Sequence, residues 1–178
     1  MSEKGPTAVR VAAIADRAGV NKQLISYYFG GKDGLLRALG QRWRERKQAY
    51  DQPERGLPEV IAEFARVATA NAVDTRLVGW EGLTYRTGKE DPDIAARTEQ
   101  AQHDLADFRR RQDNGELADN LDPDCVFLAA VAACAAPVLL PHIAYSLTGT
   151  DPTSPEFTRR YSEQLARIFA HLAAPDRT

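Results

Sequence analysis

The side chains best suited to a chemical task gather on one short predicted helix, residues 22–29. With about 100° of rotation per residue, its polar side chains fall on a single outward face. These side chains are Lys22, Gln23, Ser26 and Tyr27. Cationic, amide, hydroxyl and phenol groups near a helix N-terminus are suited to hydrogen bonding with base edges in the major groove of DNA.

A preceding helix, residues 11–18, is predicted to position this surface. Its apolar residues recur at steps of three and four and are Val11, Ile14, Ala15 and Ala18. Gly19 stands where the helix must end and the backbone must bend, which a residue without Cβ tolerates best. Asn21 is a good N-cap for the second helix, whose inner side carries Ile25 and Phe29. The pattern predicts a helix–turn–helix.

Residues 9–39 also resemble the DNA-binding signature of the tetracycline-repressor (TetR) family. The residues that carry the resemblance are Ile14-Ala15, Ala18-Gly19-Val20, Ile25, Tyr28-Phe29, Gly31-Lys32-Asp33 and Leu35. One departure is Ser26, which stands where the family usually has a Tyr in its recognition helix. A second is that the family places a full helix before this motif, whereas this chain has only MSEKGPTA there. We therefore expect the first helix of the DNA-binding domain to be missing.

The resemblance implies an all-α, dimeric transcriptional regulator. It would comprise a helix–turn–helix DNA-binding domain with its connecting helix (residues 1–50) and a helical-bundle ligand-binding and dimerisation domain (residues 51–178). We expect Lys22 and Gln23 to contact bases, and Tyr28 and Lys32 to contact phosphates. The full predicted DNA-binding set is Arg10, Lys22, Gln23, Leu24, Ser26, Tyr27, Tyr28 and Lys32.

The charge distribution favours a DNA partner independently of the resemblance. Residues 1–50 carry ten Lys or Arg and four Asp or Glu, a net charge of +6. The remaining residues carry a net charge of −8, which the overall charge of −2 conceals. A basic N-terminal part suits a polyphosphate partner, and an acidic remainder stays clear of the duplex.

Composition and motifs weigh against several other classes of protein. At 178 residues with 43% hydrophobic and 27% charged residues, the chain reads as a globular protein with one or two domains. Its N-terminus lacks an apolar signal region, and Cys125 and Cys134 would point to opposite sides of one helix, so a reduced, cytoplasmic setting is expected. We found no catalytic grouping, no metal-ligand spacing and no phosphate loop, and we expect neither an enzyme nor a cofactor.

The rest of the chain also reads as helical. The predicted helices cover residues 33–50, 57–73, 75–86, about 92–115, 123–147 and 155–172. Residues 125–147 are long and apolar enough to span a bilayer, but their many alanines, their prolines and their lack of interfacial flanks favour a buried helix. Pro137 and Pro141 should kink this helix.

Two expectations concern the body of the protein. The resemblance implies a homodimer in which the last two helices, residues 123–147 and 156–172, form the interface. A small, largely apolar organic effector is expected between the central helices. The candidate lining residues are Trp80, Tyr85, His103, Phe127 and His142.

Two functions remain open at the level of sequence. The first is a ligand-responsive regulator, a repressor that binds a palindromic operator as a dimer. The alternative is a helical small-molecule-binding and dimerisation module whose DNA-binding domain is incomplete.

Overall fold

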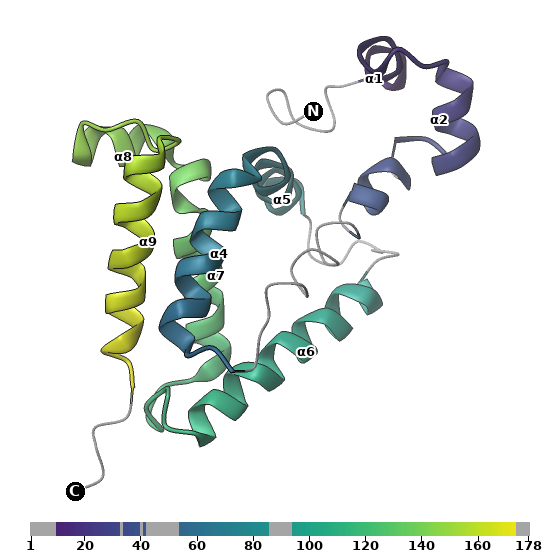
Figure 1. The fold of residues 1–178 in the computed structure, drawn as a ribbon. Helices are drawn as coiled ribbons and strands as arrows, with labels where there is room; N and C mark the ends of the chain where they lie inside the picture. The colour runs from purple at the N-terminus through teal and green to yellow at the C-terminus, as the bar shows by residue number, and fades with distance from the viewer. Residues whose placement is uncertain (1–9, 33, 40, 42–53, 86–93, 174–178) are drawn as a thin grey trace, which may run out of the picture. The chain divides into compact units, whose positions relative to one another are not determined.

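The computed structural model of the chain describes residues 10–32, 34–39, 41, 54–85 and 94–173 (Figure 1). Helices are the only regular secondary structure within these ranges, and the all-α fold class is confirmed. The chain divides into two compact units: residues 1–51 with 71–85, and residues 52–70 with 86–178. The domain boundary after residue 50 stays a prediction, because α5 (Ala72–Thr84) belongs to the same unit as the N-terminal residues.

The predicted helix–turn–helix is present in the first unit. α1 spans Val11–Ala18 and α2 spans Lys22–Phe29. Gly19 ends α1 in the left-handed conformation, with φ of 67°, so the residue without Cβ stands where the turn requires it. Asn21 caps α2 through its side chain, which accepts a hydrogen bond of 2.9 Å from the backbone N–H of Gln23.

The contact between α1 and α2 is small. Ala15 and Ile25 are buried, as their spacing predicted. Phe29, which was predicted to face inward, keeps 39% of its surface exposed.

The chain turns again directly after α2. Gly30 and Gly31 have positive φ values of 67° and 108°. Residues 34–39 are helical, as predicted, and a Cβ at Gly34 would overlap the carbonyl oxygen of Phe29. Only glycine therefore fits at this close approach. Most of the predicted helix 33–50, and the N-terminal segment where a first helix is expected to be missing, lie outside the described residues.

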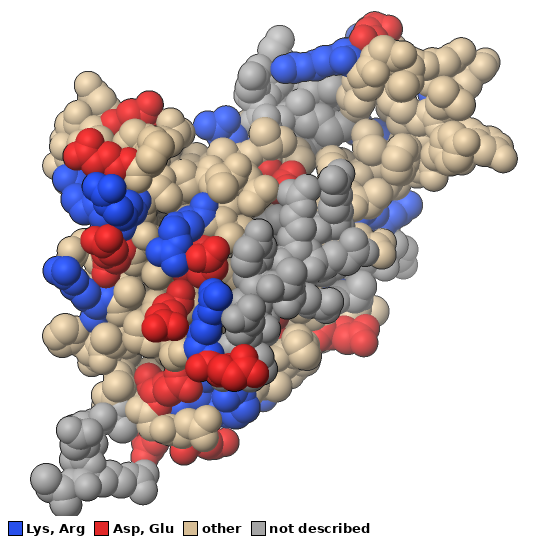
Figure 2. Space-filling view, in the orientation of Figure 1, with Lys and Arg blue, Asp and Glu red and all other residues tan. Residues whose placement is uncertain are grey.

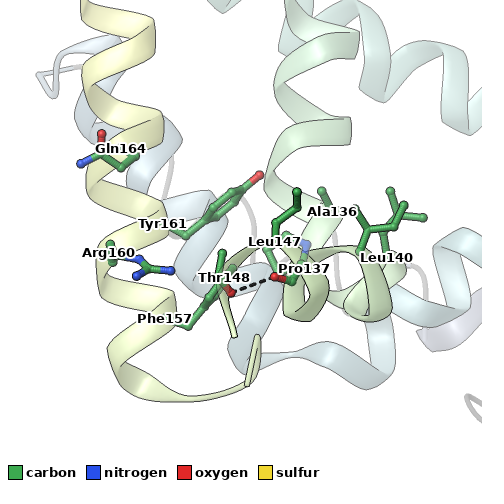
Figure 3. A pocket seen from close by; sticks show the side chains of 11 residues that line it. Ala136, Pro137, Leu140, Leu147, Thr148, Phe157, Arg160, Tyr161 and Gln164 are labelled. Atoms are coloured by element: carbon green, nitrogen blue, oxygen red, sulfur yellow. Dashed lines mark hydrogen bonds between the residues drawn. The ribbon is translucent and has the colours of Figure 1, made fainter. Parts of the chain in front are cut away.

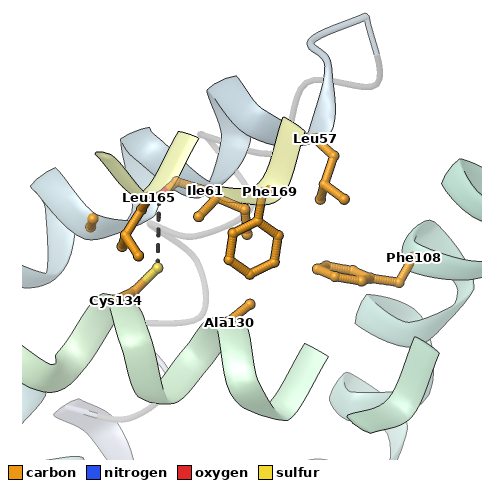
Figure 4. Close-up of a cluster of buried hydrophobic side chains, with 8 residues drawn as sticks. Leu57, Ile61, Phe108, Ala130, Cys134, Leu165 and Phe169 are labelled. Carbon is orange, nitrogen blue, oxygen red and sulfur yellow. Dashed lines mark hydrogen bonds between the residues drawn. The ribbon is translucent and has the colours of Figure 1, made fainter. Parts of the chain in front are cut away.

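The second unit is built around α4, which spans Leu57–Ala70. α4 packs against α7 (Pro123–Leu139) and α9 (Pro155–Ala170), and α6 (Ile94–Asp113) packs against α7. One apolar cluster fills the interior (Figure 4). Its buried members are Leu57, Ile61, Ala65, Phe108, Ala130, Cys134, Leu165 and Phe169.

The helix boundaries follow local capping signals. Asp122 caps α7 and precedes Pro123 at the first helical position, and Ser154 does the same before Pro155 for α9. In the first unit α5 spans Ala72–Thr84, whereas the sequence predicted residues 75–86.

The segment predicted as one kinked helix over residues 123–147 is helical and bends at Pro141, but it is not one helix. Two helices replace it, α7 and α8 (Pro141–Thr148), which meet at an angle of 80° around Leu140. Pro141 has no N–H group and disfavours the helical conformation at Leu140, whose φ and ψ are −123° and 50°. The proline therefore begins a new helix instead of kinking one.

Within the described ranges, no single helix has the length and apolar composition needed to cross a membrane. α7 and α8 meet both criteria only when taken together as a bent pair.

A buried guanidinium fastens the end of α6 to the start of α4. Arg111 has no exposed side-chain surface, and its Nε donates to Asp107 at 2.7 Å. Its Nη1 donates to Glu116 at 2.9 Å and to the backbone carbonyl of Arg55 at 2.7 Å. Glu116 in turn accepts a hydrogen bond of 2.6 Å from the N–H of Leu57, the first residue of α4. Arg111 thus contacts two carboxylates and a backbone carbonyl, while its Nη2 is buried without a hydrogen-bond partner among the described residues, and Glu116 satisfies the first backbone N–H of α4.

The cluster also determines the charge state of Asp107. Burial alone would raise the pKa of this carboxyl, but hydrogen bonds and charges from Arg111 and Arg110 outweigh burial and hold the pKa below its ordinary value of 3.8. Because the folded-state pKa is the lower one, the stabilisation is complete above pH 3.8 and is lost as the pH falls through the folded-state pKa.

We predict that Arg111→Met lowers the free energy of unfolding by about 3 kcal/mol near pH 7, because it removes the buried guanidinium from the partly buried carboxylates of Asp107 and Glu116. The loss should shrink below about pH 4, where Asp107 becomes protonated in the variant. Urea denaturation followed by circular dichroism, near pH 7 and below about pH 4, measures the loss of unfolding free energy.

Arg109→Met is the matched control for this prediction. Arg109 pairs with Asp124 at 3.1 Å, but both side chains are more than half exposed, so its removal should cost less than about 1 kcal/mol. Equal losses for the two variants would contradict the special role of the buried cluster.

Candidate functional site

The outward face of α2 is the candidate DNA-binding surface. Tyr27 and Tyr28 are 82% and 71% exposed, and Leu24 is 46% exposed. Lys22, Gln23 and Ser26 are exposed on the same helix. Six of the eight predicted DNA-binding residues therefore share one short, solvent-facing helix.

The two remaining predicted residues flank the helix pair. Arg10 lies directly before α1, in extended conformation and exposed, and Lys32 follows the glycine turn after α2 and is half-buried. Together the eight residues supply cations, an amide, hydroxyls and phenols, which can bind phosphates and base edges.

The local structure explains why this surface can present its polar groups. Ile25 anchors α2 against α1, and the Asn21 cap uses the backbone N–H of Gln23, so neither interaction occupies the side chains on the outward face. Tyr27 and Tyr28 contact each other edge to face, with ring centroids 5.1 Å apart. The pair forms an aromatic surface at the C-terminal end of α2.

The charge of the first unit favours an anionic partner. The described residues 10–41 contain five basic residues, Arg10, Arg17, Lys22, Lys32 and Arg37. Asp16 is the acidic residue described in this range. The surface of the second unit differs, since basic and acidic side chains are interspersed over α9 (Figure 2). A net positive first unit fits contact with phosphates.

The five candidate effector-binding residues do not form one described site. Trp80 and Tyr85 belong to the first unit, where Trp80 is half-buried and Tyr85 exposed. His103, Phe127 and His142 belong to the second unit. His103 and His142 are exposed, and Phe127 packs edge to face on Phe108 at 5.1 Å. The predicted pocket stays a prediction.

The interior of the second unit holds a buried thiol beside a phenol. Burial raises the pKa of Cys134 to about 12, and its Sγ lies 3.6 Å from the carbonyl oxygen of Ile61. Burial, and next the nearby Cys134, raise the pKa of Tyr161, which donates to the carbonyl of Ala133 at 2.8 Å. Such a thiol is protonated and unreactive at neutral pH. In the described part of the chain, no three His, Cys, Asp or Glu side chains are grouped to hold a metal ion.

Sequence reasoning missed an apolar groove of about 520 Å³ on the second unit, between the C-terminal end of α7, α8 and the N-terminal half of α9 (Figure 3). None of the five candidate effector residues lines it. Pro141 was the available signal, because the groove depends on the chain turning there. The direction of that turn was not readable from sequence.

Comparison with known proteins agrees with the geometry of the first unit. Residues 1–39 match the model of the bacterial regulatory proteins of the tetR family. The chain is 28% identical over 165 residues to the HTH-type transcriptional repressor SCO4008 of Streptomyces coelicolor, covering 92% of this chain and 85% of that protein. It is 35% identical over 86 residues to the HTH-type transcriptional regulator BetI of Burkholderia thailandensis, covering 43% of this chain and 40% of that protein.

The fold is also similar to that of a solved regulator. The ketosteroid transcriptional regulator KstR2 of Mycobacterium tuberculosis aligns with a TM-score of 0.63 at 16% identity, covering 98% of this chain and 89% of that chain. The helix–turn–helix, the family match over residues 1–39 and the similarity along the rest of the chain together support a bacterial transcriptional regulator of the tetR family.

Proposed function

We propose that this regulator is a ligand-responsive repressor that acts in the cytoplasm and binds a palindromic operator as a homodimer. The observation that carries the proposal is the exposed polar and aromatic face of α2, held by the buried Ile25 and the Asn21 cap. Similarity to a named repressor over 92% of the chain supports the direction of regulation.

The proposed dimer surface combines neighbouring faces of α7 and α9. Ala129, Ala133 and Ala136 recur at steps of three and four on α7, and the hydrogen bond from Tyr161 to the carbonyl of Ala133 joins this face to α9. Ile168, two turns further along α9, leaves 55% of its surface exposed. Small residues beside an exposed apolar residue suit close approach of a second copy about a twofold axis.

The proposed effector is a small organic molecule that shifts the dimer between DNA-binding and released states. A ligand changes such an equilibrium only through different affinities for the two states. Trp80, Tyr85, His103, Phe127 and His142 remain the proposed lining of its pocket.

We predict separate roles for two residues in DNA binding. Gln23→Ala should reduce the preference for the selected operator by about 1–3 kcal/mol while leaving affinity for random duplexes nearly unchanged, because it removes a base contact. Lys32→Ala should weaken binding to all duplexes and reduce the salt slope by about one, because it removes a phosphate contact. Operators selected from random duplexes, then titrated by fluorescence anisotropy, measure both.

Arg167→Ala is the control for charge alone, since Arg167 lies exposed on α9 in the second unit. Arg167→Ala should change neither the preference for the operator nor the affinity for random duplexes. Equal losses on operator and random duplexes for both Gln23→Ala and Lys32→Ala would disprove the division of roles.

We predict that Ile168→Glu yields a monomer with weak operator binding. The substitution places a charge on an exposed side chain, so the fold should persist while a twofold apolar contact is lost. Light scattering after size-exclusion chromatography gives the mass. Ala170→Glu adds the same charge at an exposed position on another face of α9 and should remain dimeric.

The alternative function gives a different result in these experiments. A small-molecule-binding and dimerisation module with an incomplete DNA-binding domain would form dimers but select no operator from random duplexes. That outcome would replace the repressor proposal.

A further inference from the structure

The outward face of α2 has two chemically different edges. Rotation of about 100° per residue, counted from the buried Ile25, assigns the side chains to these edges. One edge is polar and carries Lys22 and Ser26. The other edge carries Leu24 and Tyr28, which lie one helical turn apart at a step of four residues. The face therefore offers apolar surface beside its hydrogen-bonding groups.

Leu24 is the aliphatic side chain of this face. It is the third residue of α2, directly after Gln23, and 46% of its surface is exposed. Val20, in the turn that leads into α2, is also exposed, by 42%. The N-terminal residues of a recognition helix are the ones that contact base edges in the major groove. Leu24 thus stands where base contacts are expected but has no group that can form a hydrogen bond.

The backbone holds Leu24 in this outward position. Its N–H donates to the carbonyl of Asn21 at 3.0 Å, and the side chain of Asn21 accepts from the N–H of Gln23 at 2.9 Å. Ile25, the next residue in the chain, is buried and packs α2 against α1. Leu24 cannot turn inward without displacing Ile25 from that contact. Its exposure is therefore a consequence of the helix–turn–helix itself.

The major groove of DNA contains one apolar group that can match such a side chain. Base edges there present hydrogen-bond donors and acceptors, and thymine adds its C5-methyl group. The described residues 10–41, with five basic residues and Asp16, favour approach of the duplex. Once the helix lies in the groove, Leu24 gains free energy of binding by covering a methyl group and gains none from a polar base edge.

We propose that Leu24 makes the operator specific for thymine by covering its C5-methyl group. The inference rests on the proposed DNA-binding function and assigns a second kind of recognition to α2. Gln23 would recognise hydrogen-bonding groups, whereas Leu24 recognises the methyl group. Uracil keeps every hydrogen-bonding group of thymine and lacks only this methyl, so the contact can be removed from the DNA alone.

The test replaces each thymine of the selected operator in turn by deoxyuridine. Fluorescence anisotropy with the full chain should show a loss of affinity of about fourfold at one thymine in each half-site, since a methyl group is no longer covered there. Replacing that thymine·adenine pair by 5-methylcytosine·guanine should give tighter binding than cytosine·guanine by a similar factor. This second comparison separates recognition of the methyl group from recognition of the rest of the base.

Leu24→Ala should bring the ratio of thymine to deoxyuridine affinity at that position close to one. Leu24 is exposed and alanine favours helix formation, so the variant should fold. Leu24→Met keeps an apolar side chain of similar size and should retain the discrimination. Leu83→Ala is the matched control, because it removes the same side chain from a 72% exposed position on α5 and should leave the ratio unchanged.

Two outcomes would overturn this inference alone. One is a selected operator in which no thymine shows a methyl effect, and the other is a methyl effect of equal size in Leu24→Ala and the unsubstituted chain. Both leave the repressor proposal intact, because operator selection and its Gln23 dependence are measured on unmodified DNA. Failure to select any operator would overturn both proposals.

Discussion

The burial of α4 between α7 and α9 is the contact on which the second unit depends. Leu57, Ile61 and Ala65 lie on one face of α4 and are almost completely buried in the apolar cluster. Burying such side chains stabilises a fold by about 1.5–3 kcal/mol for each large one. Because α7 and α9 both pack on α4, this helix sets how they are arranged relative to each other. The groove and the proposed dimer surface, which both involve α7 and α9, depend on that arrangement.

The buried Arg111 cluster makes the packing of α4 geometrically specific. Apolar packing alone tolerates sliding of one helix along another, whereas the guanidinium must reach Asp107, Glu116 and the carbonyl of Arg55 together. The cluster therefore fixes the start of α4 against the end of α6.

The candidate DNA-binding surface and the groove are built in different ways. On α2 the side chains proposed to bind DNA are exposed, and Ala15 on α1 and Ile25 on α2 are buried between the two helices. The groove instead has walls from distant parts of the chain, and Arg160 lies at it with its guanidinium over the ring of Phe157. A long-range electrostatic partner such as DNA can be met by an exposed helix, whereas the shape of a groove depends on the packing of several helices.

The sequence by itself determined the local elements. Gly19 marks the end of α1 and Asn21 the start of α2, and the outward face of α2 follows from helical rotation. Proline and N-cap residues mark the starts of α7 and α9. The tertiary structure decided the rest. It turned the predicted helix 123–147 into α7 and α8 at 80°, buried Arg111, and placed Arg160 beside Phe157 at an apolar groove. The physical reason is the distance along the chain over which each kind of interaction acts. Caps and periodicity act over a few residues, whereas burial and cavity shape arise from packing between residues far apart in the chain.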